Sequence, residues 1–503
     1  MLNFGIIDWI IIFIYLAITM SAGLAMRRHV SKVEDFILAG REMDLYLGIA
    51  SLAATEFGII TAMYTAELGY KNGFAGATPG ILNAVAMLLV GLTGFVIKPL
   101  RDSGSYTIPE LLNQRFGPKV RWLAGLVIVL GGILNMGVFF RVGGEFLVIM
   151  SGIPYSYLEI IMTFLVVLVL IYTVLGGMLS VLVTDYLQFL VMGIGLVVVS
   201  LVVFSNTGWE NVVTTVENQR GSGGFNPLTS EDMGPIYIVW QGFNQLAAVV
   251  TWQTVIQRVL AARTSSIARK IYTRTSFYFV GRFLIPAFWG MAALTVLGTN
   301  NHSYSSLQAM PIFLSSLLPT GLIGLLIAAM LAAEMSTDSS YLLTWSNILY
   351  NDLICPLRKQ PFSEKTGLFL NRSIVVGIAG FLLLYGLWYQ APGRVWDYLS
   401  ITANIYLSSI FVLLVSCCYW KGARPVGAVG AIIGGAIPPV VFLVISQIEF
   451  PVLTSTMSET LLNSTVQWLS RSEVSGLLSF GFASVGMILG SWISTLKESQ
   501  KNQ

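Results

Sequence analysis

Long apolar stretches alternate with short polar connections along almost the whole chain. A helix that crosses a bilayer needs about 20 mainly apolar residues. By that measure the sequence predicts thirteen membrane-spanning helices, at roughly residues 5–25, 46–70, 74–99, 122–150, 155–175, 181–204, 234–257, 275–297, 318–346, 372–390, 396–419, 425–446 and 474–496. A membrane β-barrel would show shorter, alternating segments, so the pattern predicts an all-α polytopic membrane protein.

Composition agrees with that reading. Of the 503 residues 55% are apolar types and only 11% are charged, and the mean hydropathy is +0.76. Soluble domains carry about 25% charged residues. We therefore expect a multi-pass protein of the plasma (inner) membrane, with the lipid bilayer as its partner. A net charge of +3 without a long basic run argues against nucleic acid, and nothing indicates an obligatory protein partner.

The basic residues set the predicted orientation. If the N-terminus lies outside, most of the 28 Lys and Arg residues fall in the predicted cytoplasmic connections. The predicted outer connections hold only Lys71, Arg220, Arg394 and Arg471. A miscounted helix would reverse every later connection and destroy this bias. The sequence thus predicts an N-out/C-in topology and a single membrane domain over 1–503. Its longest connections are the outer loops 205–233 and 447–473.

Several ionisable residues fall at predicted membrane depth, where a charge costs several kcal/mol. They are Glu56, Arg141, Glu145, Asp185, Arg282, Glu334 and Asp338. Arg141 and Glu145 are one helical turn apart and could neutralise each other. Purely structural helix packing in a membrane uses small apolar residues, so the whole set favours a polar pathway through the protein.

The segment LAAEMSTDSSYLL, residues 331–343, concentrates hydroxyl groups inside an apolar helix. At helical spacing Ala333, Ser336, Thr337 and Ser340 share one face. Hydroxyls and carbonyls are hard oxygen ligands, and without thiolate or imidazole they suit a loosely held monovalent cation. The alternative is that each hydroxyl bonds to a carbonyl of its own helix, as is common in membranes.

A cation site also needs carbonyl groups released from helical bonding. The segment LAATEFGIITAM, residues 52–63, places Thr55, Glu56 and Gly58 in the middle of the second span and predicts a break there. The polar run WQGFNQ, 240–245, predicts a second break in the seventh span. Broken helices at membrane depth line cavities and hold ions in transporters built from two repeats. The helix count suggests five-helix repeats over 46–204 and 234–419.

Five motifs, in order, resemble the sodium/solute symporter family, which includes sodium-coupled proline, galactose and sialic acid transporters. They are YTIPELLNQRFG (106–117), YTVLGGMLSVLVTDYLQ (172–188), QRVLAAR (257–263), MSTDSS (335–340) and YWKGARPVGAVGAIIGG (419–435). The resemblance implies a LeuT-type inverted-repeat core of ten helices. An extra helix, 5–25, would precede this core, and two more, within 425–496, would follow it.

The resemblance also implies binding residues. A principal sodium ion (Na+) would bind carbonyls of Ala54, Phe57 and Ala333 and hydroxyls of Ser336 and Thr337. A second sodium ion is plausible at Asp185, Ser339 and Ser340. The implied solute-binding residues are Glu56, Gly58, Thr61, Arg141, Gln241, Asn244, Gln245 and Arg282. Glu334 and Asp338 depart from the family pattern. For Glu56 three roles stay open: binding an ammonium group, carrying a proton, or pairing with Arg282.

These features together favour a sodium-coupled symporter that imports a small polar organic solute by alternating access. Two arginines and an acid favour an organic acid or amino acid, with a sugar or polyol as the alternative. A transporter-like sensor would carry signalling domains after the core, and none follows the last span. A channel would need a continuous polar stripe. No nucleophile–base set or phosphate-binding loop indicates an enzyme.

Overall fold

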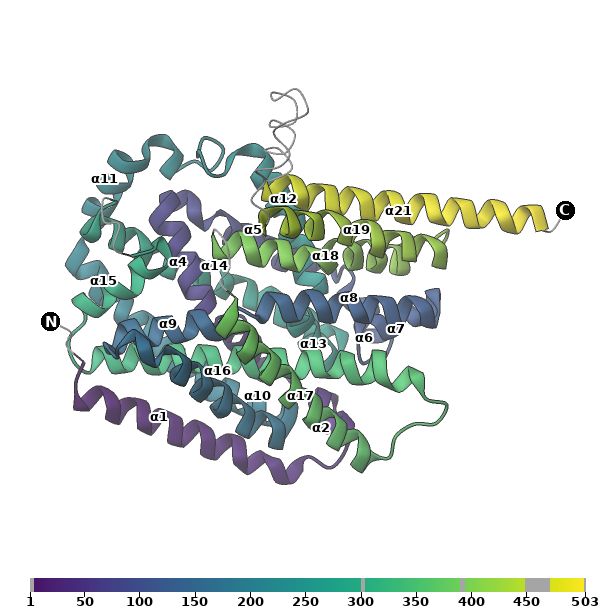
Figure 1. Ribbon diagram of the computed structural model, residues 1–503, viewed down its shortest axis with the longest axis horizontal. Coiled ribbons are helices and arrows are strands. Elements are labelled where there is room, and N and C mark those ends of the chain that lie inside the picture. Colours follow the sequence, from purple (N-terminus) through teal and green to yellow (C-terminus); the bar gives the residue numbers. More distant parts are fainter. Residues whose placement is uncertain (1–3, 300–303, 390–393, 448–470, 502–503) are drawn as a thin grey trace.

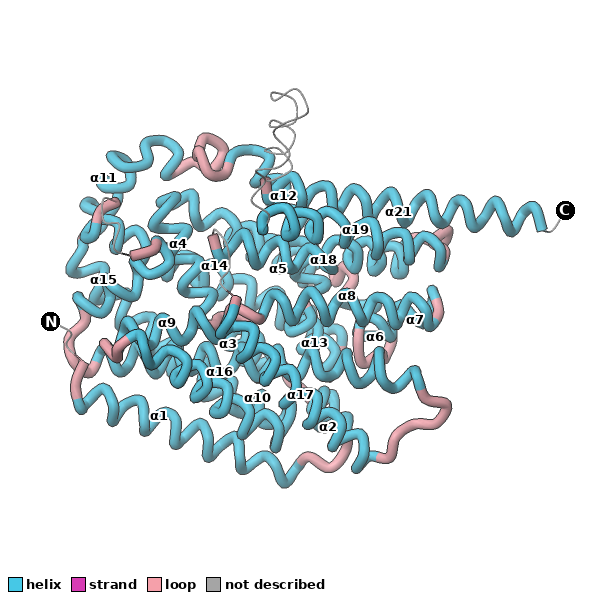
Figure 2. Tube along the Cα trace, viewed as in Figure 1, coloured by secondary structure: helices cyan, strands magenta, loops and turns pink. Residues whose placement is uncertain are grey.

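The computed structural model describes residues 4–299, 304–389, 394–447 and 471–501. Helices form nearly all of this part, and its β-type pairing is limited to one isolated bridge between Met43 and Ala262 (Figure 2). Most helices run roughly along the longest axis, and the start of the first and the end of the last lie at opposite ends (Figure 1). The predicted all-α class is confirmed. Most of the predicted loop 447–473 lies outside the described residues.

The α-helices are numbered as in Figure 1. They are α1 (Ile6–Ala25), α2 (Val33–Leu38), α3 (Leu45–Thr55), α4 (Ile59–Asn72), α5 (Thr78–Thr93), α6 (Ile97–Asp102), α7 (Ile108–Phe116), α8 (Pro118–Met136), α9 (Phe139–Ser151), α10 (Leu158–Thr207), α11 (Trp209–Arg220), α12 (Gly234–Thr251), α13 (Gln253–Ala261), α14 (Ser265–Leu297), α15 (Ala309–Leu317), α16 (Leu322–Ile348), α17 (Glu364–Trp388), α18 (Val395–Tyr419), α19 (Pro425–Gln447) and α21 (Ser472–Lys501).

Ten stretches of the described residues are long and apolar enough to cross a bilayer. The prediction of thirteen differs because Ile59–Thr93 and Tyr155–Thr207 each join predicted spans, and because the segment 234–257 is divided. Within α10 the two predicted spans meet at Gly177, where φ is 53°. A Cβ atom there would lie 2.5 Å from the Phe36 ring, so both the backbone and the packing require glycine.

The second predicted span is broken where the sequence places the break. Helix α3 ends at Thr55 and α4 begins at Ile59, with Glu56, Phe57 and Gly58 between them. Within the described residues, no backbone N–H donates to the carbonyl of Phe57. That oxygen therefore keeps its capacity to accept a bond from something other than the backbone.

The predicted second break at 240–245 is wrong. These residues continue the helix α12, and the chain breaks at Trp252 instead, where φ is −64° and ψ is 116°. The side chains explain the error. Nε2 of Gln245 donates to the side-chain oxygen Oε1 of Gln241, one turn earlier, at 2.9 Å, and so leaves the backbone hydrogen bonds of the helix intact. Polar side chains inside an apolar helix mark a face turned toward a polar space, not a break in the backbone.

Helix α16 is surrounded by other helices along most of its length. Every residue from Leu326 to Ile348 is buried, and α16 packs against α1, α3, α10 and α17. The peripheral helices α1 and α21, by contrast, expose large apolar side chains such as Phe13 and Trp492, as a lipid-facing surface requires. Because α16 has no lipid face, its hydroxyls and carboxylates can only face the interior of the bundle.

Candidate ion and solute sites

The break between α3 and α4 lies directly against α16. The hydroxyl of Thr337 donates to the carbonyl of Thr55 at 2.8 Å. Gly58 comes so close that a Cβ atom on it would lie 3.0 Å from Oγ1 of Thr337. The structure thus brings together the two segments that the sequence singled out, in the interior of the bundle.

The predicted ligands of the principal sodium ion lie on both sides of this contact. Ala54 lies in the last turn of α3, Phe57 in the break, and Ala333, Ser336 and Thr337 on α16, and all five are buried. The hydroxyl of Ser336 donates its proton to Oδ1 of Asp185 at 2.5 Å. Because both hydroxyls donate to other acceptors, their lone pairs stay available to a cation. The coordinating oxygens are hard ligands and mostly neutral, which fits a monovalent ion.

The predicted ligands of a second ion lie one turn further along α16. Asp185 of α10 is fully buried and accepts a bond from Ser51 at 2.5 Å. Ser340 contacts the hydroxyl of Thr55 at 3.0 Å. Ser339 instead donates to the carbonyl of Ser336 on its own helix, at 3.1 Å. The structure therefore unites Asp185 and Ser340 but turns the Ser339 hydroxyl back on its helix.

A guanidinium group enters this second cluster. Arg258 of α13 is fully buried and lies 3.4 Å from Oδ2 of Asp185. It donates to Thr55 Oγ1 at 2.6 Å, to Ser51 Oγ at 3.2 Å and to Ser340 Oγ. The sequence places Arg258 in a cytoplasmic connection, and that assignment is wrong because Gln253–Ala261 is a buried helix. Because Arg263 and Arg269 follow it closely, the sequence makes Arg258 look like part of a basic loop.

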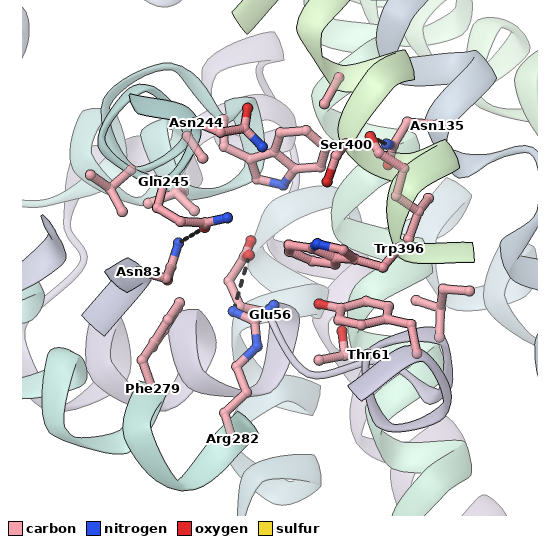
Figure 3. Close-up of a pocket in the computed structure, with 18 of the residues that line it drawn as sticks. Glu56, Thr61, Asn83, Asn135, Asn244, Gln245, Phe279, Arg282, Trp396 and Ser400 are labelled. Atoms are coloured by element: carbon pink, nitrogen blue, oxygen red, sulfur yellow. Dashed lines mark hydrogen bonds and ion pairs between the residues drawn. The ribbon is translucent and has the colours of Figure 1, made fainter. Parts of the chain in front are cut away.

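A pocket opens beside the break (Figure 3). Its walls come from α4, α5, α12, α14 and α18, with Thr55 and Thr337 at its ion-site side. Aromatic rings form much of the lining, with Tyr64 and Trp396 only 4.8 Å apart between ring centres. The mixture of aromatic rings with a few polar groups is typical of small-molecule sites.

The charges inside the pocket neutralise each other. Nη1 of Arg282 lies 3.6 Å from Oε2 of Glu56, and both side chains are at least nine-tenths buried (Figure 3). Thr254 donates a further bond to Oε1 of Glu56 at 2.7 Å. The guanidinium also lies over the ring of Phe279, at 4.6 Å from its centre. Of the three roles left open for Glu56, the geometry matches pairing with Arg282.

Amide and hydroxyl groups supply the remaining polarity. Asn83 donates to Oε1 of Gln245 at 2.7 Å (Figure 3). Among the described residues, Oδ1 of Asn83, Oδ1 of Asn244 and Oγ of Ser400 have no hydrogen-bond partner although they are buried. Buried polar atoms are nearly always bonded, so these three are available to a bound solute.

The predicted solute-binding residues divide into two groups. Glu56, Thr61, Asn244, Gln245 and Arg282 line the pocket. Gly58, Gln241 and Arg141 do not line it. Gly58 faces the ion site, and Gln241 lies one turn from Gln245 and accepts its bond.

Arg141 lies in a separate hollow, at the end of the bundle that the sequence predicts to face outward. Its Nε is 3.4 Å from Glu145, which also accepts a bond from Tyr155 at 3.0 Å. This hollow also contains Lys71 and Arg394, which the sequence places in outer connections. The geometry is that of the alternative in which Arg141 and Glu145 neutralise each other.

Glu334 and Asp338 are fully buried on α16. Oε2 of Glu334 accepts the backbone N–H of Ile59 at 2.9 Å, so this carboxylate caps the first turn of α4. Among the described residues, neither oxygen of Asp338 has a hydrogen-bond partner, and no Lys or Arg pairs with either acid. The departure at Glu334 thus has a structural role at the helix break.

Sequence reasoning missed several pocket residues. Asn83, Asn135, Trp396 and Ser400 line the pocket but were not predicted. Each is a single polar or aromatic residue in an otherwise ordinary span, so no local pattern distinguishes it. Only the packing of α5, α8 and α18 around the break brings them together.

Comparison with known proteins places these features in context. The sodium:solute symporter family matches residues 36–435. A sodium/glucose cotransporter of Vibrio parahaemolyticus is 25% identical, over 92% of this chain and 89% of that protein. The human sodium/myo-inositol cotransporter 2 is 26% identical, over 93% and 76%. A sodium/sialic acid symporter of Aliivibrio fischeri is 25% identical, over 78% and 79%.

Two solved structures share the fold. A substrate-bound, outward-open sodium-coupled sialic acid symporter superposes with a TM-score of 0.81 at 19% identity, over 98% of each chain. MhsT in complex with L-phenylalanine superposes with a TM-score of 0.56 at 13% identity, over 90% of this chain and 99% of that one. The expected LeuT-type architecture is confirmed. The match over most of its length shows that this multi-pass membrane protein is a transporter rather than an enzyme, and that it belongs to the sodium:solute symporter family.

Proposed function

We propose that this protein imports a small, neutral, hydroxyl-rich solute, of the sugar or polyol class, together with sodium. The observation that carries the proposal is the ion pair between Glu56 and Arg282 inside the pocket. An anionic solute would need an uncommitted cation there, and Arg282 is committed to Glu56. The other arginine of the sequence argument, Arg141, faces Glu145 outside the pocket. The preference for an organic acid or amino acid therefore gives way to its alternative.

The uncommitted polar atoms of the pocket support a neutral solute. They include the amide and hydroxyl oxygens of Asn83, Asn244 and Ser400, which accept bonds from hydroxyl groups; Nε of Arg282 is a further atom without a hydrogen-bond partner among the described residues. Trp396 and Tyr64 supply apolar faces against which the C–H face of a sugar or cyclitol ring can pack. Glucose and myo-inositol cotransporters among the relatives are consistent with this chemistry.

The principal sodium ion would bind to carbonyls of Ala54, Phe57 and Ala333 and to the hydroxyls of Ser336 and Thr337. Bound there, it would hold the broken helix against α16 and complete the pocket wall, because Thr55 and Thr337 belong to both. Coupling is reciprocal, so sodium and solute each raise the affinity for the other by the same factor. A membrane potential contributes about 2.3 kcal/mol per charge and 100 mV toward inward release.

Uptake by the purified protein in proteoliposomes tests the proposal. Radiolabelled glucose, galactose and myo-inositol are compared with sialic acid and proline, with an inward sodium gradient and with choline in its place. We expect gradient-dependent accumulation of at least one neutral polyhydroxylated compound. Sodium-driven uptake of only the charged or zwitterionic compounds would refute the solute class, and uptake that ignores sodium would refute the coupling.

A further inference from the structure

A groove on the lipid-facing side of the molecule separates α1 from the core. Helix α1 runs along the edge of the bundle (Figure 1), and the walls of the groove come mainly from α1, α9 and α10. Ile327 and Leu331 of α16 form its floor. We infer that the groove binds an acyl chain of a membrane phospholipid, and that this chain supports α16. The binding site is separate from the ion and solute sites, and only its effect on sodium rests on the proposed function.

The lining of the groove suits hydrocarbon alone. All but one of the side chains that line it are apolar, and the exception, Ser151, donates its hydroxyl proton to the carbonyl of Leu147 at 2.6 Å. A bound water molecule needs two to four polar partners, which these walls do not offer. An empty gap would forfeit dispersion contacts on every side. At the rim, Phe13 and Phe164 are at least half exposed, so the groove is continuous with the surface that lipid covers.

The fold keeps the groove from closing. Near one end of α1, Asp8 accepts the backbone N–H groups of Gly321 and Gly324, at 2.8 and 2.5 Å. Two turns further along, the hydroxyl of Tyr15 lies 3.7 Å from Sδ of Met335. These two contacts fix the spacing between α1 and α16, and the groove lies beside the stretch between them. Helix α1 therefore cannot move inward to fill the gap with its own side chains.

Only a slender occupant fits. Ile12 and Leu147, which line two of the walls, are just 6% and 8% exposed, so the groove is narrow. A helix with its side chains is about 10 Å wide and would rest on the rim, whereas a single hydrocarbon chain can reach the floor. The shape thus favours an acyl chain over an accessory helix or a second copy of this protein.

The direction of the groove matches that of a lipid chain. From Trp9 to Leu16 it follows α1 for about 10 Å, which lies within the roughly 15 Å depth of one hydrocarbon leaflet. Trp9 lies near the start of α1, Tyr155 and Tyr157 directly precede α10, and all three rings are about half exposed. Exposed Trp and Tyr residues mark the level of the lipid headgroups. The phospholipid therefore belongs to the leaflet on the side that the sequence predicts to face outward.

The floor of the groove connects the lipid to the ion site. Leu331 precedes Ala333, a predicted sodium ligand, by two residues on α16. Close-packed interiors transmit small displacements, so the packing behind Leu331 affects where Ala333 lies. A chain in the groove supplies that packing on the side of α16 that faces away from the solute pocket.

Photochemical labelling of the purified full-length protein in nanodiscs tests the inference. The probe is a phosphatidylcholine that carries a diazirine at the end of one acyl chain, and peptide mapping by mass spectrometry locates its cross-links. We expect cross-links at Ile327 or Leu331, because both are only 3% exposed and a chain on the outer surface does not reach them. Labelling confined to exposed positions such as Phe13 would overturn the inference.

Ile161→Trp and Ile160→Trp form a matched pair on α10. Ile161 lines the groove, so an indole ring there takes the space of the chain, and labelling of the floor should be lost. Ile160 is 63% exposed and does not line the groove, so labelling should persist in its variant. Equal labelling in the two variants would overturn the inference. If Ile161→Trp does not fold, the map of the wild-type protein still decides.

A photoreactive residue at the rim identifies the occupant directly. Phe164→benzoylphenylalanine places the reactive group at the mouth of the groove. An adduct with the mass of a phospholipid is expected. A cross-linked pair of chains would show that a second copy fills the groove, and would overturn the inference.

Equilibrium binding of ²²Na⁺ measures the effect on α16. Removal of bound phospholipid by detergent should lower the sodium affinity of the wild type severalfold, and added phosphatidylcholine should restore it. In Ile161→Trp the indole ring replaces the chain, so the affinity should respond less to lipid. The same response in both proteins would overturn the support of α16 by lipid. No saturable binding in nanodiscs would overturn the proposed function, while the cross-linking result would stand.

Discussion

The hydroxyl of Thr337 shows how much one residue contributes here. It bonds to the carbonyl of Thr55, approaches Gly58, and lines the solute pocket. The sequence predicted a hydroxyl-bearing face on this helix from spacing alone, because the 3.6-residue period fixes which side chains share a side. The contacts that each hydroxyl makes depend on neighbouring helices, so the sequence could not show that Ser339, which the resemblance grouped with Ser340, bonds to its own helix.

Removing the ion ligands should weaken sodium binding. Ser336→Ala or Thr337→Ala deletes one oxygen ligand, and a lost bond to a charged partner costs about 1.5–3 kcal/mol, or roughly 10- to 150-fold in affinity. We therefore expect the sodium concentration for half-maximal uptake to rise by at least tenfold. Ser346→Ala is the control, because Ser346 donates only to Leu343 of its own helix. An unchanged sodium dependence in both ligand variants would contradict the site.

The two arginines should respond differently to substitution. Arg282→Gln leaves Glu56 buried without its partner and should abolish uptake, because breaking a buried pair costs about 3–5 kcal/mol. Arg141→Gln breaks a partly exposed pair outside the pocket and should leave uptake within about threefold of the wild type. Initial uptake rates at saturating sodium measure both. Loss of uptake in Arg141→Gln would instead indicate that this residue binds the solute, as in the organic-acid alternative.

At the scale of elements, the broken helices define the sites. The break at 56–58 was predictable because a glycine and a carboxylate interrupt an apolar run, and the structure supplies its cap from Glu334. The break at Trp252 was not predictable, because nothing in the local sequence weakens the helix there. Trp252 is held from outside, by a bond from its indole to the Tyr341 hydroxyl at 2.8 Å.

The close contact at Gly58 provides a test of this arrangement. Its φ is −85°, so alanine meets no backbone strain, and any effect comes from the new methyl group. That group would lie 3.0 Å from Oγ1 of Thr337 and 3.3 Å from Oε2 of Glu334, so these side chains or the start of α4 must shift by a few tenths of an ångström. We expect Gly58→Ala to weaken sodium binding severalfold and Gly58→Val to weaken it further.

Gly242→Ala is the matched control for Gly58→Ala. Gly242 lies on α12, and a Cβ atom there would meet nothing within 4 Å. Sodium affinity, measured by displacement of ²²Na⁺, should stay at the wild-type value. Equal affinities in the wild type and all three variants would mean that the break does not have to touch α16 for sodium to bind.

At the scale of the whole molecule, composition was sufficient for the class, because lipid forces long apolar helices. The N-out/C-in orientation remains a prediction from the bias of Lys and Arg toward one side. The assembly around the site was not accessible in this way, as Arg258 illustrates: counted by composition it joins the cytoplasmic charges, whereas packing buries it in the core. The division into two five-helix repeats remains a prediction.

Outside that predicted core, α19 and α21 pack against each other through glycines. A substitution there can change the stability of the protein without changing the predicted sodium site. A Cβ atom on Gly486 would lie 2.4 Å from the carbonyl of Gly430. Gly486→Val should cost roughly 1–3 kcal/mol of packing energy and lower the melting temperature in detergent. Sodium affinity should not change. Gly481→Val, on the same helix in open space, is the control, and a matching loss of stability there would contradict the packing argument.

The wall shared by the two sites, formed by Thr55 and Thr337, has a consequence for pharmacology. If sodium binds as proposed, an inhibitor that fills the pocket rests against residues whose arrangement depends on the ion, and its potency depends on the sodium concentration of the assay. Compounds ranked in potassium buffers would then be ordered by their affinity for the sodium-free form of the protein. Potencies measured across a sodium titration would identify the compounds that use this wall.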